Sequence, residues 1–177
     1  NVYLAEVQNS DIRKVATNGI ISTVAGNQQF GFSGDGGAAT SAKLNGPTDV
    51  QVDAAGNLYI SDSSNNVIRK VNGAGTISTI AGDTNYGYAG DGGLASVMQF
   101  AGLTAAALDG SGNLFVTDTG NNVVRRVKVD STSLNFGTVN IGQTGGLAQE
   151  VPIQIEPLNV AASEICRCRA GRGSRAR

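Results

Sequence analysis

The chain repeats itself with a period of 56 residues, and this repeat constrains its fold more than any other feature. The register runs from residue 1 to residue 127 without a gap. Matching segments begin at Asn1, Asn57 and Asn113, at Ile12, Ile68 and Val124, at Ile21 and Ile77, and at Gly34 and Gly90. Long fixed periods are typical of solenoids and propellers, in which one supersecondary unit stacks on the next.

Each period contains short runs that favour β-strands. In the complete period four runs cover residues 49–53, 57–61, 67–71 and 76–81, with β-branched and aromatic residues in the runs and Gly and Asn between them. One four-stranded meander cannot bury both of its faces, and radial stacking of several solves this problem. A helical solenoid would need a 3.6-residue apolar period, which is absent. The sequence therefore predicts an all-β fold, a β-propeller fragment of four-stranded antiparallel blades.

Composition and charge narrow the class of protein. Apolar residues make up 40% and charged residues 15% of the chain, which also has 25 Gly, and this is neither a disordered nor a collagen-like composition. Residues 1–165 hold 8 Lys and Arg against 14 Asp and Glu, whereas residues 166–177 hold five Arg and no acid. The acidic body argues against a nucleic-acid partner. Cys166 and Cys168 are too few for a zinc site, and no apolar run is long enough to span a membrane.

Two segments of the period resemble a known family. Residues 57–71 read Asn-Leu-Tyr-Ile-Ser-Asp-Ser-Ser-Asn-Asn-Val-Ile-Arg-Lys-Val, which resembles the core of an NHL repeat. Residues 31–47 are similar to the insertion of bacterial and teneurin-type NHL propellers. Glu6 and Leu103 depart from the pattern, since the other periods have Asp and the middle one has Pro there. The resemblance covers residues 1–127 and implies a ring of about six blades, of which this chain supplies the end of one, one complete blade and most of a third.

The repeat ends near residue 127, and two further segments follow it. Residues 128–160, which include the run from Ser133 to Gly142, resemble the start of an Ig-like β module, too short to close a sandwich. Residues 161–177 form an Arg/Gly-rich tail. We interpret this tail as disordered or as the product of a truncated or shifted reading frame, with a basic tail for an anionic partner as the alternative. Because Asn1 falls inside a predicted strand, we interpret the chain as a fragment.

The predicted strand order places two kinds of loop on one face of the blades. These are the links of about twenty residues that contain Gly-Asp-Gly-Gly and the turns between second and third strands. Links this long are often functional. The candidate binding residues on this face are Phe32, Asp35, Asn65, Asn66, Tyr88, Asp91, Asn121 and Asn122. The alternative for Asp35 and Asp91 is a tight turn in which each carboxylate bonds its own backbone.

Other recurring polar residues have structural interpretations. Asp62 and Asp118 follow second strands, and we expect them to cap the turns that come next rather than to hold a central cation. Arg13, Arg69 and Arg125 recur in third strands, and we expect each to pair with a nearby Asp between blades rather than with phosphate or an acidic partner. The loops at residues 53–57 and 109–113 lack the late Glu of a calcium loop and are predicted to be hairpin turns.

The residues favour a non-catalytic function. The chain has no His, which excludes a Ser-His-Asp triad within it, and it predicts no metal site and no cofactor. We expect a binding or scaffold module of a secreted or cell-surface bacterial protein, whose loops hold a protein, peptide or glycan, with no nucleic-acid partner and no membrane span. A lactonase- or lyase-type enzyme with its metal in other blades, and a purely structural spacer, are the alternatives. Since an unclosed propeller exposes the flat faces of its end blades, residues 1–127 alone should associate or be marginally stable.

Overall fold

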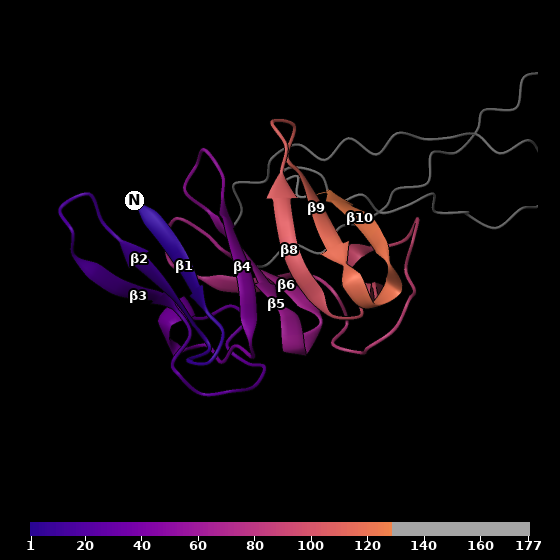
Figure 1. Ribbon diagram of the computed structural model, residues 1–177, viewed down its shortest axis with the longest axis horizontal. Coiled ribbons are helices and arrows are strands. Elements are labelled where there is room, and N and C mark those ends of the chain that lie inside the picture. The colour runs from indigo at the N-terminus through magenta and orange to yellow at the C-terminus, as the bar shows by residue number, and fades with distance from the viewer. Residues whose placement is uncertain (129–177) are drawn as a thin grey trace, which may run out of the picture. The chain divides into compact units, whose positions relative to one another are not determined.

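The computed structural model describes residues 1–128, and these residues form three antiparallel β-sheets with short links between them (Figure 1). The predictions for residues 129–177, including the Ig-like segment and the Arg/Gly-rich tail, lie outside the described residues. The first blade contains β1 (Val2–Glu6), β2 (Asp11–Val15) and β3 (Ile21–Ala25). The central blade contains β4 (Pro47–Val52), β5 (Leu58–Asp62), β6 (Val67–Val71) and β7 (Ile77–Ala81). The third contains β8 (Leu103–Leu108), β9 (Asn113–Asp118) and β10 (Val123–Lys128).

The order of strands within each sheet follows the order of the sequence. The central sheet runs β4-β5-β6-β7, and the other two run β1-β2-β3 and β8-β9-β10. Each blade is therefore a meander, as the repeat predicts. The predicted third strand has the observed bounds, whereas β4 begins two residues before the predicted start, at Pro47. The first blade supplies three strands, β1, β2 and β3, which are equivalent to β5, β6 and β7 one period later and so form the end of a blade, as the sequence predicts.

Four short 3₁₀ helices interrupt the connections, and the sequence analysis missed them. They are η1 (Ala39–Ser41), η2 (Ser63–Asn65), η3 (Ala95–Val97) and η4 (Thr119–Asn121). η2 and η4 lie between second and third strands and end at Asn66 and Asn122, both with left-handed backbone. Asparagine tolerates this conformation better than most residues, which explains the Asn-Asn pair in both turns. None of the helices in residues 1–128 has the length and hydropathy of a membrane-spanning segment.

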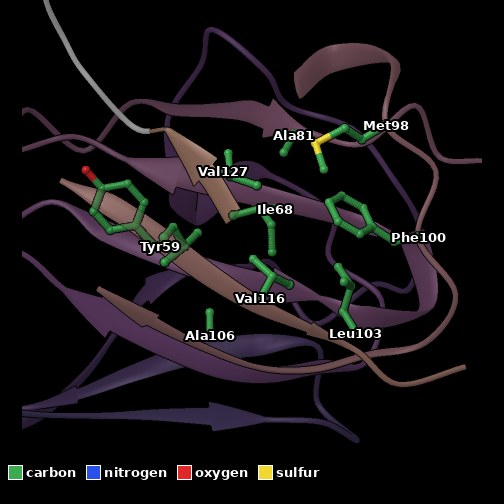
Figure 2. Packing of buried hydrophobic residues seen from close by; sticks show 10 residues of the cluster. Tyr59, Ile68, Ala81, Met98, Phe100, Leu103, Ala106, Val116 and Val127 are labelled. Atoms are coloured by element: carbon green, nitrogen blue, oxygen red, sulfur yellow. The ribbon is translucent and has the colours of Figure 1, made fainter. Parts of the chain in front are cut away.

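Alternating side chains build two hydrophobic clusters between the blades. Leu58 and Ile60 of β5 contact Ile12 and the residues of the link before β4, while Tyr59 of the same strand lies in the other cluster. Successive residues of a strand point to opposite faces, so one strand serves both neighbours. Figure 2 shows the second cluster, in which Tyr59, Ile68 and Ala81 of the central blade meet Met98, Phe100, Leu103, Ala106, Val116 and Val127. Each large side chain buried there contributes roughly 1.5–3 kcal/mol.

Polar contacts fix the inner strands of neighbouring blades against each other. Thr48 of β4 donates a hydrogen bond to the carbonyl oxygen of Leu103 at 3.3 Å, and Ser63 donates another to the same oxygen. The backbone N–H of Ala106 donates to Asp49 at 2.8 Å. These bonds set the position of β8 beside β4, and with it the position of the link that leads into β8.

Candidate functional site

Arg69 of β6 ties the central blade to the link before it, residues 26–46, which we call link 1. Its side chain is fully buried. The guanidinium donates to the carbonyl oxygens of Ser33 at 3.0 Å and Lys43 at 3.4 Å. It also pairs with Asp35 of link 1 at 2.8 Å and with Asp62 of the neighbouring strand at 3.4 Å. We call these five residues the Arg69 cluster. They confirm the expectation that the recurring Arg pairs with nearby Asp, although the two acids lie in the same blade and in the link before it and not between blades.

Arg125 forms the same arrangement in the third blade, with link 2, residues 82–102. Its Nε and Nη2 both donate to one oxygen of Asp91, at 3.0 and 2.5 Å. Further bonds of 2.6 Å go to the carbonyl oxygens of Ala89 and Gln99, and Asp118 lies 3.6 Å away. Hydrogen bonds between ionised groups are about twice as strong as neutral ones, so each link is fastened to the blade that follows it.

Asp35 and Asp91 do not bond their own turns, so that prediction is wrong for the side chains. The tight turns themselves are present, because Gly37 donates to the carbonyl oxygen of Gly34 at 3.0 Å and Gly93 to Gly90 at 3.1 Å. The carboxylates instead reach the arginines of the blade. The hydrogen bond from Arg125 lowers the pKa of Asp91. The arginines lie 34 residues further along the chain, which is why a local interpretation of the turn missed them.

An aromatic ring of the link lies against each arginine. The Phe32 ring lies 4.8 Å from the Arg69 guanidinium, and the Tyr88 ring lies 5.2 Å from that of Arg125. Cation–π contacts of this kind contribute about 0.5–1 kcal/mol at exposed sites. Tyr88 also donates to Asp91 at 3.0 Å, and this bond raises the pKa of the Tyr88 phenol. The rings nevertheless stay accessible, with Phe32 44% and Tyr88 58% exposed.

The predicted asparagines lie on the same face as the links. Asn65 donates to the carbonyl oxygen of Gly31 and to Asp62, both at 2.8 Å. Asn121 makes the equivalent bonds to Gly87 and Asp118 at 2.8 Å. Asn66 and Asn122 follow them in left-handed conformation. The structure therefore brings Asn65 beside link 1 and Asn121 beside link 2, while the role of the predicted residues in binding stays a prediction.

Asp62 and Asp118 are buried and do not cap the turns that follow, so that prediction is also wrong. Their carboxylates accept hydrogen bonds from the backbone of the preceding link, at 2.7 Å from Asn45 and 2.6 Å from Ala101. Burial raises the pKa of Asp62, against the opposing effect of its hydrogen bonds and of Arg69. Both residues hold the end of a link against the second strand of its blade.

Arg13 of the first blade has different surroundings. It donates to Thr23 at 2.6 Å and lies 3.9 Å from Asp11. Asp11 is buried where the other periods have Val67 and Val123. Burial, together with the charge of Glu6, raises the pKa of Asp11. Asp11 was not predicted from the sequence. The signal that could have identified it is an acidic residue at a position where the other two periods have Val67 and Val123.

The loops at residues 53–57 and 109–113 are hairpin turns, as predicted. Asp53 and Asn57 bond each other through backbone and side chains, at 2.7–3.1 Å, and Asp109 and Asn113 repeat the pattern. In the part of the chain that the structure describes, no three or more His, Cys, Asp or Glu side chains gather as metal ligands would.

Exposed aromatic residues at the rim of the links are the feature that sequence analysis missed. Phe30 is 64% and Tyr86 71% exposed, and they occupy equivalent positions two residues before Phe32 and Tyr88. An aromatic–x–aromatic spacing in both links was the signal that could have identified them. Each link therefore presents two accessible rings, one of which is held by an arginine.

The comparisons with known proteins agree with this architecture. The model of the teneurin NHL domain matches residues 31–87, which begin in link 1 and end in link 2. No curated protein matches the chain.

Three solved structures of Bacteroides proteins show the same fold. A protein of unknown function from Bacteroides thetaiotaomicron matches with a TM-score of 0.63 and 22% identity, over 70% of this chain and 31% of its own. A proposed phosphatase from the same organism matches with a TM-score of 0.56 and 22% identity, over 74% and 32%. An auxiliary nutrient binding protein from Bacteroides ovatus matches with a TM-score of 0.56 and 24% identity, over 70% and 33%.

The chain thus spans about a third of the length of the solved structures that it matches. At these identities the likeness concerns the fold alone. Residues 1–128 have the all-β, propeller-like fold of these structures, and residues 31–87 carry the pattern of a teneurin NHL domain.

Proposed function

We propose that this chain is part of a non-catalytic binding module of a secreted or cell-surface bacterial protein. The observation that carries the proposal is the pair of exposed aromatic residues in each link, Phe30 with Phe32 and Tyr86 with Tyr88. Their partner is a protein, a peptide or a glycan. The surfaces that bind such partners present accessible apolar rings beside polar groups.

The arginine clusters make the rings suitable for binding. Since Arg69 and Arg125 each hold a link through carbonyl oxygens and a carboxylate, the loop backbone is ordered before a partner arrives. Ordering a loop in advance removes part of the entropy cost of association. Asp35 and Asp91, with side chains 44% and 59% exposed, offer additional acceptors to hydroxyl or amide groups next to the rings.

The comparisons support the proposal only through the fold. The Bacteroides ovatus protein is an auxiliary nutrient binding protein, so propeller-like chains of this kind include binding proteins. Because one fold hosts many functions, the residues of the links carry the argument.

The test is capture of ligands by the immobilised chain from soluble polysaccharides and from bacterial envelope extract. The comparison variant is Phe30→Ser with Tyr86→Ser, and the control is Val52→Ser, which removes another exposed apolar side chain, 40% accessible, from β4. We expect the wild type and the control to retain the same ligand, and the double variant to bind it at least tenfold more weakly. Equal retention by all three would refute a role for the rings. One tightly held divalent ion, found by metal analysis, would instead favour the lactonase- or lyase-type enzyme.

A further inference from the structure

The first aromatic ring of each link is accessible whichever repeat lies beside it. Link 1 packs on the complete central blade, and link 2 and the third blade follow it. Link 2 has the central blade and link 1 before it. Phe30 is 64% exposed in the first setting, and Tyr86 is 71% exposed in the second. Neither a preceding nor a following repeat covers this position, so the exposure of the ring is a property of the link itself.

The backbone between the two rings of each link is already hydrogen-bonded within the chain. The N–H of Gly31 donates to the carbonyl oxygen of Leu44 at 3.1 Å, and the carbonyl oxygen of Gly31 accepts from Asn65 at 2.8 Å. Gly87 of link 2 repeats both bonds, at 3.1 and 2.8 Å. A peptide that binds as an added strand needs unpaired backbone groups on its receptor. The side chains of the links, rather than the backbone between the rings, are therefore the groups that meet a ligand.

The two links differ in charge, although they share the rings. Asp35 and Asp91 recur in both, and each pairs with a buried arginine. Apart from these acids, residues 26–46 carry one further charged residue, Lys43, and residues 82–102 carry one of the opposite sign, Asp83. A strongly charged partner would be attracted by one link and repelled by the other. The features common to both links therefore fit a neutral ligand.

These common features are two aromatic rings with a partly exposed carboxylate beside them. Phe32 and Asp35 meet at the guanidinium of Arg69, and Tyr88 donates directly to Asp91. The side chains of the two acids are 44% and 59% exposed, so their remaining lone pairs can accept further hydrogen bonds. A sugar ring has an apolar face of C–H groups that suits an aromatic ring, and hydroxyl donors at its edge that suit a carboxylate.

We propose that the two links together bind a neutral polysaccharide, with one sugar unit on the rings of link 1 and another on the rings of link 2. This inference rests on the proposed function and names the class of its ligand. Since the links are equivalent and lie one blade apart, a polymer of repeating units supplies the same group to both. Two linked contacts can exceed the affinity of one by about 10²–10⁴-fold, so the polymer binds more tightly than a short oligosaccharide cut from it.

The test is affinity electrophoresis of the full 177-residue chain in native gels that each contain one polysaccharide. The neutral probes are dextran, soluble starch, xylan, mannan and mixed-linkage β-glucan, and alginate is the charged probe. The variants are Phe30→Ser and Tyr86→Ser, one for each link. The control is Ile20→Ser, because Ile20 is 64% exposed like Phe30 but lies between β2 and β3. Circular dichroism verifies that all variants keep the fold.

We expect at least one neutral polysaccharide to retard the wild type and the control equally. Each single variant should bind that polysaccharide about tenfold more weakly or less tightly still, because one of two linked contacts is lost. The disaccharide unit of the same polymer reaches only one link. Isothermal titration calorimetry should therefore show that it binds the wild type about as weakly as the polymer binds a single variant.

Three outcomes would overturn the proposal. They are equal retardation of the wild type and the single variants, retardation by alginate alone, and no retardation by any neutral probe. Capture from envelope extract then decides whether the proposed function falls as well. A protein or peptide that the wild type retains and the double variant Phe30→Ser, Tyr86→Ser loses would leave the proposed function standing without the polysaccharide. Equal capture by the wild type and the double variant would remove both.

Discussion

Arg125 donates two hydrogen bonds to a single carboxylate oxygen of Asp91, a residue 34 positions earlier in the chain. Arg69 and Asp35 have the same separation in the preceding period. In both cases the acid belongs to the link and the base to the third strand of the following blade. The contact therefore crosses from connection to sheet, and the stability of the links depends on a buried charge in the blade.

Replacement of Arg69 by methionine should destabilise the chain strongly. The substitution leaves Asp62 buried without its cationic partner, and breaking a buried pair in this way typically costs about 3–5 kcal/mol. Asp35→Asn should cost much less, because the side chain of Asp35 is 44% exposed. The measurement is urea denaturation at one fixed protein concentration. Similar losses in the two variants would show that Asp62 does not depend on Arg69.

Alanine in place of Gly82 should weaken the start of link 2. Gly82 has a φ of +98°, and a Cβ there would lie 2.4 Å from the carbonyl oxygen of Asn66. Strain of this kind costs about 1–3 kcal/mol, and relief of the clash requires backbone movement. Gly73→Ala is the matched control, because nothing lies within 4 Å of its Cβ position. Thermal unfolding of both variants tests this, and equal midpoints would contradict it.

The carboxyl groups of Asp62 and Asp91 should titrate on opposite sides of the ordinary value of 3.8. Burial raises the pKa of Asp62, and the hydrogen bond from Arg125 lowers that of Asp91. Carboxyl carbon NMR signals, assigned with Asp62→Asn and Asp91→Asn, report each midpoint directly. Both midpoints on the same side of 3.8 would be inconsistent with these surroundings.

The same shifts give stability contributions of opposite sign. The folded chain holds the Asp62 proton more tightly than the unfolded chain, so its contribution is complete below 3.8 and is lost as the pH rises through the folded pKa. The contribution of Asp91 is present above 3.8 and is lost as the pH falls through its lowered pKa. Urea denaturation between about pH 3 and about pH 7 should show that each pH dependence of stability disappears in the corresponding Asn variant.

Tyr59 should ionise only at strongly alkaline pH. Burial and the hydrogen bond to Asp53 raise the pKa of Tyr59 to about 12. In an ultraviolet titration the wild type should therefore lack part of the tyrosinate absorbance until strongly alkaline pH. Tyr59→Phe should remove only the tyrosinate absorbance that develops at strongly alkaline pH. If that absorbance persists in this variant, another tyrosine is responsible for it.

The repeat was enough to predict the strands and the face on which the links lie, because both follow from local alternation and from the register of the period. The partners of the carboxylates were not predictable in this way. A Gly-Asp-Gly-Gly segment favours a turn that bonds itself, and the competing partner, Arg69, becomes available only when the link folds against β6. Asp62 was assigned to its own turn for the same reason, whereas its carboxylate bonds the amide of Asn45, 17 residues earlier. Contacts between links and blades depend on packing, which the pattern does not encode.

The set of residues that each arginine contacts also shows where one structural unit ends and the next begins. The residues that the Arg69 guanidinium contacts, from Phe32 to Asp62, lie between Gly26 and Ala81, and the backbone of residues 36–39 pairs with residues 75–77 inside the same range. A cut at Asn57, where the sequence period is most easily recognised, would separate the arginine from Asp35 and from the carbonyl oxygens of link 1. A blade of this protein that is duplicated, deleted or transplanted should therefore be cut at Gly26 and Gly82, which follow β3 and β7. Each link then stays with the sheet to which its contacts bind it.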